Sequence, residues 1–346
     1  MSRHVGGKVR HAQDWFARHL PGIALAGLVA MSAQFVAEHS QAPSMMMALL
    51  FGMVISFVYE TDPKVRPGVE FTAKPLLKMG IVLLGARISV DVMIALGWQT
   101  ACMVTFALIA TLGLGLGVGR LLGLDRSLSM LTAGAVSICG VSAALAISAV
   151  LPKTEESDKH LLITIIGVTT LSTIAMILYP VLLQQFGIGD TLAGQILGAT
   201  IHDVAQVVGA GFSMSETTGD TATLVKLLRV SLLAPTVILL ALLMRQRKTA
   251  SNARKHNQPI IPLFVLGFFG FVALNSLGGI PDGLKEPLTM ASRAALLAAI
   301  AGVGLKTNLR QITEIGYAPI LLMLIETVFI AVVATLGFLS ISILDV

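Results

Sequence analysis

The stretch "GATIHDVAQVVGAG", residues 198–211, sets three polar side chains, His202, Asp203 and Gln206, among small and apolar residues. On a helix, His202 and Gln206 lie four residues apart and Asp203 and Gln206 three apart, so all three can line one patch. Asp203 can hold His202 charged or in one tautomer, which suits proton coupling or a switchable contact with an anion. An interhelical hydrogen-bond pair with no such role is the alternative.

The composition indicates that this stretch lies inside a membrane. Hydrophobic residues make up 55% and charged residues 12% of the chain, against roughly one-quarter charged residues in soluble domains. Successive apolar runs of about 17 to 25 residues are each long enough to cross ~30 Å of hydrocarbon. We therefore expect an all-α fold, a polytopic membrane helix bundle, with a basic cytoplasmic leader over 1–20 and a single transmembrane domain over 21–346.

Charge and cysteine content argue against other classes of protein. The net charge of +5 comes mostly from Lys and Arg between apolar runs, which positive-inside sorting explains better than nucleic-acid binding. Cys102 and Cys139 both fall inside apolar runs, so neither a disulfide nor a zinc motif is predicted, and no metal or cofactor is expected. The leader resembles a basic amphipathic lead-in; a cleaved signal peptide is the alternative.

Apolar runs bounded by Pro, Gly and charge predict about eleven transmembrane helices. They lie near residues 21–37, 43–58, 72–87, 92–119, 127–151, 160–183, 191–212, 221–244, 259–279, 287–305 and 312–342. With a cytoplasmic amino terminus, the inside loops hold sixteen Lys and Arg and the outside loops four, which are Arg87, Lys153, Lys159 and Lys285. The sequence therefore predicts a bacterial inner-membrane protein with the basic cluster 245–257 in the cytoplasm and the carboxyl terminus in the periplasm.

Two internal likenesses bear on the architecture. Residues 80–98 and 299–317 match at an offset of 219 positions, for example Gly85 with Gly304, and the helices concerned run in opposite directions in this topology. Such a match is typical of an inverted-topology transporter repeat; chance similarity between apolar segments is the alternative. Residues 135–143 and 198–206 share a second frame, but both helices are expected to run outward, which does not fit an inversion. We interpret the second frame as shared chemistry.

Ionisable groups inside apolar runs are functional candidates, because each costs several kcal/mol in hydrocarbon unless it is paired or wet. The cations are Lys78, Lys226, Arg229 and Arg293, and the acids are Asp203 and Glu326. Lys226 and Arg229 lie three apart on one helix face. An excess of embedded cations indicates an anion site; pairing with Asp203 or Glu326 that only holds the bundle together is the alternative.

The predicted helix 127–151 supplies a companion surface. Ser137, Gly140 and Ser142 interrupt its apolar run with hydroxyl groups and exposed backbone. This is the chemistry of a discontinuous helix whose freed amides can meet an anion. Close packing of small residues is the alternative.

Four stretches in combination resemble the sulfate exporter family, the YeiH-like bacterial inner-membrane proteins. They are "LLKMGIVLLGARIS" (76–89), "SICGVSAALAI" (137–147), "GATIHDVAQVVGAG" (198–211) and "VKLLRVSLLAP" (225–235). The family's motifs fall on Ile138, Cys139, Gly140 and Ser142, on Ile201, His202, Asp203 and Gln206, and on Lys226, Leu227 and Arg229. Val136 and Ser137 depart from the Thr and Ala expected there. The resemblance implies an inverted-repeat fold distantly related to the bile-acid and arsenite transporters, with sulfate as the family's assigned substrate.

The leading functional hypothesis is a secondary transporter of a small anion, such as sulfate, a sulfur oxyanion or an organosulfonate. Substrate contacts are expected from Ser137, Gly140, Ser142, Gln206, Lys226 and Arg229, and ion coupling from His202 and Asp203. The expected partners are the anion, a coupling proton or sodium ion and the lipid bilayer; a homo-oligomer is left open. No Walker-type loop occurs, so a gradient must drive transport. The alternative is an intramembrane serine hydrolase that uses Ser142 and His202.

Overall fold

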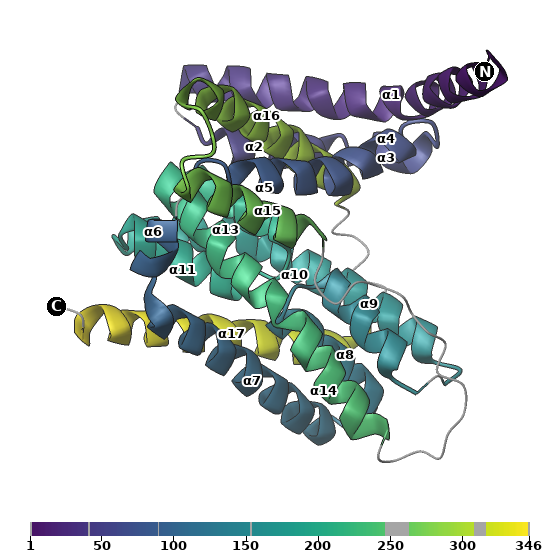
Figure 1. Ribbon diagram of the computed structural model, residues 1–346. Helices are drawn as coiled ribbons and strands as arrows, with labels where there is room; N and C mark the ends of the chain where they lie inside the picture. The colour runs from purple at the N-terminus through teal and green to yellow at the C-terminus, as the bar shows by residue number, and fades with distance from the viewer. Residues whose placement is uncertain are drawn as a thin grey trace. The chain divides into compact units, whose positions relative to one another are not determined.

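The computed structural model describes residues 2–40, 42–88, 90–152, 154–245, 263–307 and 316–344 (Figure 1). The described ranges are helical and contain no β-strand, as the sequence predicts. The helices are α1 (Ser2–Ser40), α2 (Ser44–Val54), α3 (Ser56–Thr61), α4 (Arg66–Phe71), the π-helix η1 (Thr72–Leu76), α5 (Leu77–Leu84), α6 (Val90–Ala95), α7 (Gly97–Leu121), α8 (Arg126–Ser137), α9 (Val141–Val150), α10 (Ser157–Gln185), α11 (Asp190–Thr200), α12 (Val204–Met214), α13 (Glu216–Ser231), α14 (Leu233–Arg245), α15 (Leu263–Ser276), α16 (Asp282–Lys306) and α17 (Tyr317–Leu344).

Six of the described helical segments are long and apolar enough to cross a membrane. They are Asp14–Ser40, Gly97–Leu121, Ser157–Gln185, Glu216–Leu240, Asp282–Lys306 and Tyr317–Ile343. Shorter apolar helices occupy Ser44–Val54, Val141–Val150, Val204–Met214 and Leu263–Ser276. The basic cluster predicted to face the cytoplasm lies outside the described residues, apart from Arg245.

The chain forms two compact units. Unit 1 comprises Met1–Ser89 and Gly267–Asn308, and unit 2 comprises Val90–Leu266 and Leu309–Val346. In unit 1, α16 packs against α2, η1 and α5. The α1 and α4 backbones touch at Gly22 and Gly68, where a Cβ on either residue would collide with the opposite main chain. Small residues that admit such close approach are typical of helix packing in membranes.

In unit 2, the predicted helix 127–151 is not one straight span. The chain turns back at 138–140, and α8 and α9 pack against each other as an antiparallel pair, hairpin A. Met130 and Leu131 of α8 share a buried cluster with Ile147 and Leu151 of the α9 end. Two half-length helices therefore replace the predicted single crossing.

The predicted helix 191–212 breaks in the same way. It forms hairpin B, in which α11 and α12 meet at 201–203. Gly194 of α11 and Gly211 of α12 both face α13 near Thr218, although they are far apart in a straight helix. The expected discontinuity of helix 127–151 is thus present, and a second one accompanies it.

The long apolar segment α13–α14 packs against both hairpins and shows how they are oriented (Figure 1). Its first turns, at Thr218 and Thr221, pack against the open end of hairpin B. Its later turns, at Val237 and Leu240, pack against the open end of hairpin A. Because this order follows one spanning helix, the two hairpins open toward opposite ends of unit 2. Helices α8 and α11 therefore run in opposite directions, and the prediction that both run outward is wrong.

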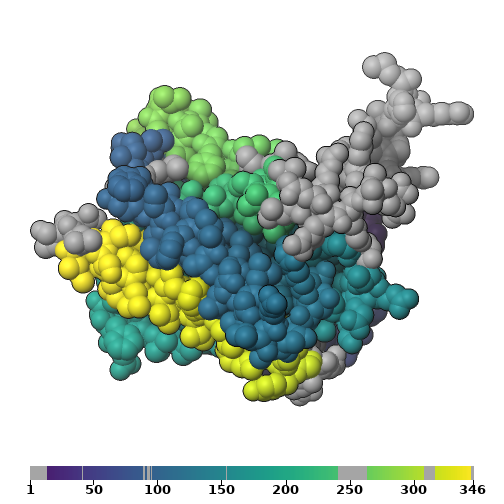
Figure 2. Space-filling view, turned by 90° about the horizontal axis from the view of Figure 1, so that it is seen from below, coloured from purple at the N-terminus to yellow at the C-terminus, as the bar shows by residue number. Residues whose placement is uncertain are grey.

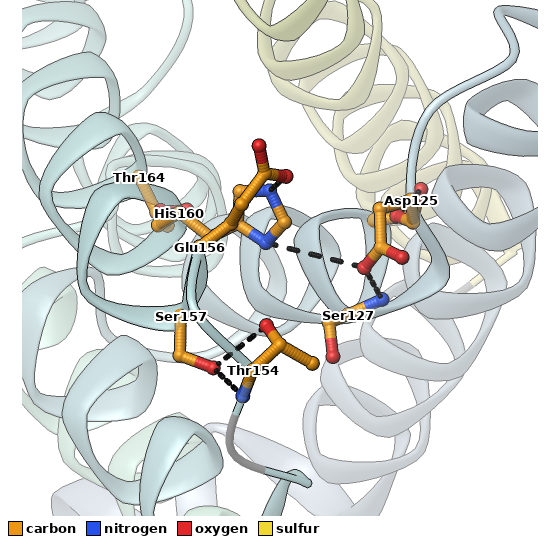
Figure 3. A network of polar contacts seen from close by, with 8 residues as sticks. Asp125, Ser127, Thr154, Glu156, Ser157, His160 and Thr164 are labelled. Carbon is orange, nitrogen blue, oxygen red and sulfur yellow. Dashed lines mark hydrogen bonds and ion pairs between the residues drawn. The ribbon is translucent and has the colours of Figure 1, made fainter.

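The start of α10 lies beside the start of α8. His160 Nδ1 is 3.9 Å from Asp125 Oδ1, and His160 Nε2 is 3.4 Å from Glu156 Oε2 (Figure 3). The exposed residue Lys159, predicted to lie in an outside loop, therefore shares an end of unit 2 with Arg126, which precedes the predicted helix 127–151 at its expected inside end. That part of the predicted topology fails because hairpin A returns the chain to the end from which it entered.

Helices α7 and α17 pack side by side in unit 2 (Figure 2), and the contacts between them show that they run in opposite directions. Met103 of α7 lies at Gly337 of α17, and Gly119 lies at Leu322. In unit 1, the segment from η1 to α5 also packs antiparallel to its neighbour, α16. Thr72 lies at Gly302, and Gly80 lies at Leu296. These are the helices of the repeat predicted at an offset of 219 positions, and their superposition remains a prediction.

Candidate functional site at the hairpin tips

The tips of the two hairpins meet in the centre of unit 2. At the tip of hairpin A, Gly140 has φ 64°, a conformation that L side chains rarely adopt. A Cβ on Gly140 would lie 3.7 Å from the main chain of His202 at the tip of hairpin B. The chain reverses within 138–140 and 201–203, and these reversals leave main-chain carbonyls without partners in a helix.

Lys226 of α13 binds both tips. Its Nζ donates to the carbonyl oxygens of Ile138 and Ile201, each at 2.9 Å. The side chain is fully buried. The same ammonium group therefore satisfies one carbonyl from each hairpin.

Arg229, one turn further along α13, completes this set. Its Nε donates to Ser137 O at 2.7 Å, and its two terminal nitrogens donate to Val136 O at 2.5 Å and Ile201 O at 3.2 Å. The guanidinium is 1% exposed. These carbonyls close the last turn of α8 and follow the last turn of α11, where a helix dipole places partial negative charge, so buried cations suit the position.

Lys226 and Arg229 cap the carboxyl ends of the half-helices α8 and α11. Both cations bind main-chain carbonyls, and neither forms a salt bridge with an acid in the described ranges. Lys226 and Arg229 therefore bind helix-end carbonyls instead of the acids Asp203 and Glu326, with which pairing was the alternative. Because carbonyls are neutral, the positive charge of both residues stays uncompensated by these contacts.

His202 is buried at the tip of hairpin B with both ring nitrogens engaged. Nδ1 lies 3.1 Å from Val136 O, and Nε2 lies 3.0 Å from Thr327 Oγ1 of α17. A carbonyl only accepts, so Nδ1 carries a proton. The Thr327 hydroxyl has one proton and two acceptors within reach, which are Nε2 of a neutral His202 ring and Met323 O at 2.7 Å. His202 thus joins the tips of both hairpins to α17.

Asp203 is the N-cap of α12 and is half-buried. Its Oδ1 accepts from the amide of Ala205 at 2.8 Å. Ser172 of α10 supports the same turn, because its Oγ accepts from the amides of His202 at 3.2 Å and Asp203 at 3.1 Å. Asp203 therefore has a structural contact as well as the coupling role expected for it.

The first turn of α9 differs from that of α12. Its N-cap, Gly140, offers no side chain to the leading amides, and Ser142 in this turn is exposed. The amides that begin a helix have no acceptor within that helix and carry partial positive charge. This N-terminus, which Gly140 leaves without a side-chain cap and whose Ala143 amide faces the Cys139 thiol, lies beside the tips and is suited to an anion.

Gln206 lies one turn into α12 and is buried. Its Nε2 donates to Thr173 Oγ1 of α10 at 2.7 Å, and its Oε1 has no hydrogen-bond partner among the described residues. Ser137 is also buried, and its carbonyl rather than its hydroxyl binds Arg229. The structure thus gathers Ser137, Gly140, His202, Lys226 and Arg229 by direct contact, with Gln206 bound to α10.

The sequence did not single out several parts of this site. Ser172 and Thr327 bind the hairpin B tip, and the carbonyls of Val136, Ile138 and Ile201 bind the cations. A hydroxyl residue in the middle of an apolar helix is a weak signal, because most such groups bond to their own helix. Every residue has a backbone carbonyl, so the sequence does not indicate which carbonyls bind the cations.

The geometry does not favour the hydrolase alternative. The ring nitrogens of His202 face Val136 and Thr327, and no hydrogen bond links His202 to Ser142 in the described ranges. A general base must reach its nucleophile within about 3.2 Å. This pair lacks the contact that nucleophilic catalysis requires.

The fold and the hairpin pair define a polytopic helical membrane protein. Residues 21–323 match the family described as "Conserved hypothetical protein 698", and the chain belongs to this family. It is similar to the UPF0324 membrane protein TauZ of Paracoccus denitrificans, at 48% identity over 317 residues, which cover 92% of this chain and 94% of TauZ. A UPF0324 membrane protein of Chlorobaculum tepidum is 44% identical over 329 residues, covering 94% of this chain and 91% of the relative.

Proposed function

We propose that this protein is a secondary transporter of a small anion, driven by an ion gradient. The observation that carries the proposal is the meeting of two opposed hairpin tips at a pair of buried cations. Non-helical backbone at membrane depth is tolerated only where protein buries it or where it lines a cavity. Discontinuous helices at the midplane are the usual construction of transporter binding sites.

The charge at the tips favours an anion. Lys226 and Arg229 bring positive charge that neutral carbonyls do not cancel, and the uncapped start of α9 adds the positive end of a helix dipole. The amides of this turn and the Ser142 hydroxyl are then the direct ligands. Lys226 and Arg229 act by their field and by holding the tips, and Gln206 contributes a polar group at the edge of the same region.

The hairpin B tip takes part in ion coupling in this proposal. The His202 ring, at the tip of hairpin B, contacts hairpin A and α17, so a change in its protonation would alter these two contacts. Asp203 caps the adjoining half-helix and supplies the second titratable group. The coupling ion is a proton or sodium.

The architecture in the bilayer follows from the two hairpins. Helices α7, α8 and α9 and helices α10, α11 and α12 form two equivalent sets at an offset of 63 positions, one inverted relative to the other. Hairpins A and B are re-entrant and enter from opposite sides of an inner membrane. The amino terminus and the end of α14 are cytoplasmic, and the carboxyl terminus is periplasmic.

Flux into proteoliposomes tests the proposal, with sulfate, sulfite and a short alkanesulfonate as probes. We expect uptake of at least one probe that depends on an imposed pH or sodium gradient. Ser142→Ala should weaken uptake, whereas Ser340→Ala, on the exposed part of α17, should not. Folded, monodisperse protein that moves no probe under either gradient would exclude the sulfur-anion substrate class. Equal activity of Ser142→Ala and wild type would remove α9 from the site.

A further inference from the structure

Glu326 is a buried acid that the site described above does not use. It lies within α17 and is 0% exposed. Its Oε1 is 3.1 Å from Thr132 Oγ1 of α8. Its Oε2 is buried and has no hydrogen-bond partner in the described part of the chain, and no salt bridge reaches the carboxyl from those residues.

The hydrogen-bond pattern fits a protonated carboxyl group. Thr132 has one hydroxyl proton and two acceptors within reach, Glu326 Oε1 and Ser129 O at 3.2 Å. A protonated Glu326 donates to Thr132, which then donates to Ser129 O, so each proton has an acceptor. An ionised Glu326 would hold one hydrogen bond and no cation in a buried site, which is strongly unfavourable.

The surrounding helices are shaped to receive this carboxyl. A Cβ on Gly115 of α7 would collide with Glu326 Oε1 and would lie 2.5 Å from Ala133 Cβ of α8. A Cβ on Gly113 or Gly117 would have no neighbouring group within 4 Å in the described part of the chain. Gly115 therefore leaves room for the acid between α7, α8 and α17.

The other charged groups on neighbouring elements lie elsewhere. Helix α17 packs against α7, α8, α10 and α11. The described titratable or charged residues of these helices and their flanking turns are Cys102, Arg120, Asp125, Arg126, Cys139, Glu155, Glu156, Asp158, Lys159, His160, Tyr179, Asp190, His202 and Asp203. Within the described ranges, none of them forms a hydrogen bond or a salt bridge with Glu326. His202 is linked to the next residue of α17 through Thr327.

The acid is connected to the hairpin tips through two short steps. Thr132 lies one turn before Val136, whose carbonyl accepts from Arg229 and faces His202. Thr327, which bonds to His202, is adjacent to Glu326 in the chain. Movement of α8 relative to α17 would therefore change both the carboxyl site and the tip contacts.

We propose that Glu326 is a proton-binding site and that it carries the proton exchanged in the transport cycle, which rests on the function proposed above. The proton stays on the carboxyl while α7, α8 and α17 exclude water. When the packing of α8 against α17 opens, the proton passes to water and the carboxylate that remains is hydrated. The reverse step takes one proton from water on the other side of the cycle.

Infrared spectroscopy of the full chain in liposomes tests the proton site without any substrate. We expect a protonated carboxylic-acid band that is lost in Glu326→Gln and retained in Glu286→Gln, whose side chain is exposed on α16. Gly115→Ala should shift or remove the band, whereas Gly117→Ala should leave it unchanged. A band that is absent from wild type, or that survives in Glu326→Gln, overturns the proposal.

Proton movement during sulfate flux tests the coupling. We expect Glu326→Gln to retain sulfate exchange and to lose sulfate-dependent proton movement, with Glu286→Gln like wild type. Proton movement at the wild-type ratio in Glu326→Gln overturns the coupling role. If wild type carries no sulfate, the proposed function fails for this anion, and the infrared band alone decides the proton site.

Discussion

The carbonyl oxygens of Ile138 and Ile201 accept hydrogen bonds from the same ammonium group, each at 2.9 Å from Lys226 Nζ. The two residues hold the same place in the shared frame of residues 135–143 and 198–206. Each carbonyl lies directly after a half-helix, one in hairpin A and one in hairpin B. The frame that does not fit an inversion of straight helices fits an inversion of hairpins.

Gly140→Ala should destabilise the protein by about 1 to 2 kcal/mol, because an L side chain would be forced into positive φ. Space is not the obstacle, since the added Cβ would be 3.7 Å from its nearest neighbour. The measurement is the thermal unfolding midpoint in detergent. Gly117→Ala, at an open helical position of α7, is the matched control and should be neutral or stabilising. Equal midpoints for the two variants would contradict the assigned tip conformation.

Arg229→Lys should lose stability even though it keeps the charge. The planar guanidinium donates to three carbonyls in fixed directions. The ammonium group of lysine is compact and cannot reach all three carbonyls from one position. Each buried carbonyl left unpaired costs about 1 to 3 kcal/mol. Arg120→Lys, on the exposed end of α7, is the control for the substitution itself. A stability equal to that of Arg120→Lys would show that the carbonyls do not depend on Arg229.

Ser172→Ala should loosen the hairpin B tip, because two amides lose their acceptor. We expect a loss of about 1 to 3 kcal/mol and faster hydrogen exchange at residues 202 and 203. Thr170→Ala is the comparison, since its hydroxyl bonds to Ile166 O of its own helix. Unchanged exchange at both amides would argue against this contact.

Asp203→Asn and Asp203→Ala should separate capping from coupling. Asn caps a helix about as well as Asp, whereas Ala costs about 1 kcal/mol. Asp203→Asn should therefore fold normally and bind sulfate while the dependence of transport on pH or sodium is lost. Asp203→Ala should also lose stability. Normal coupling in a folded Asp203→Asn variant would leave Asp203 with the capping role alone.

The helical class and the apolar segments could be predicted from composition and run length, because lipid imposes a length on every span. The break at Gly140 was also predictable, since glycine and serine interrupt an apolar run there. The reversal of the chain at Gly140 and His202 was not. A half-length helix pair and one full span have the same number of apolar residues, and packing across the hairpin, such as that of Met130 and Gly134 with Ile147, distinguishes them.

The members of the site could be predicted better than their contacts. His202, Lys226 and Arg229 stood out as polar groups in apolar runs, and the structure brings them together. Their partners are mostly backbone carbonyls, whose positions depend on where the chain breaks. The excess of cations indicated an anion site. It could not reveal that Lys226 and Arg229 bind the carbonyls at the helix ends.

Side-specific cysteine labelling in oriented membrane vesicles can show whether the two hairpins enter the membrane from opposite sides. In a chain with Cys102 and Cys139 replaced by Ala, single cysteines would be placed at Arg126, Glu155, Thr191 and Thr217, all exposed positions at the open ends of the hairpins. We expect positions 126 and 155 to react from one side of the membrane and positions 191 and 217 from the other. Labelling of 126 and 191 from one side, with 155 and 217 from the opposite side, would mean straight spans and would contradict the opposed entry of the two hairpins.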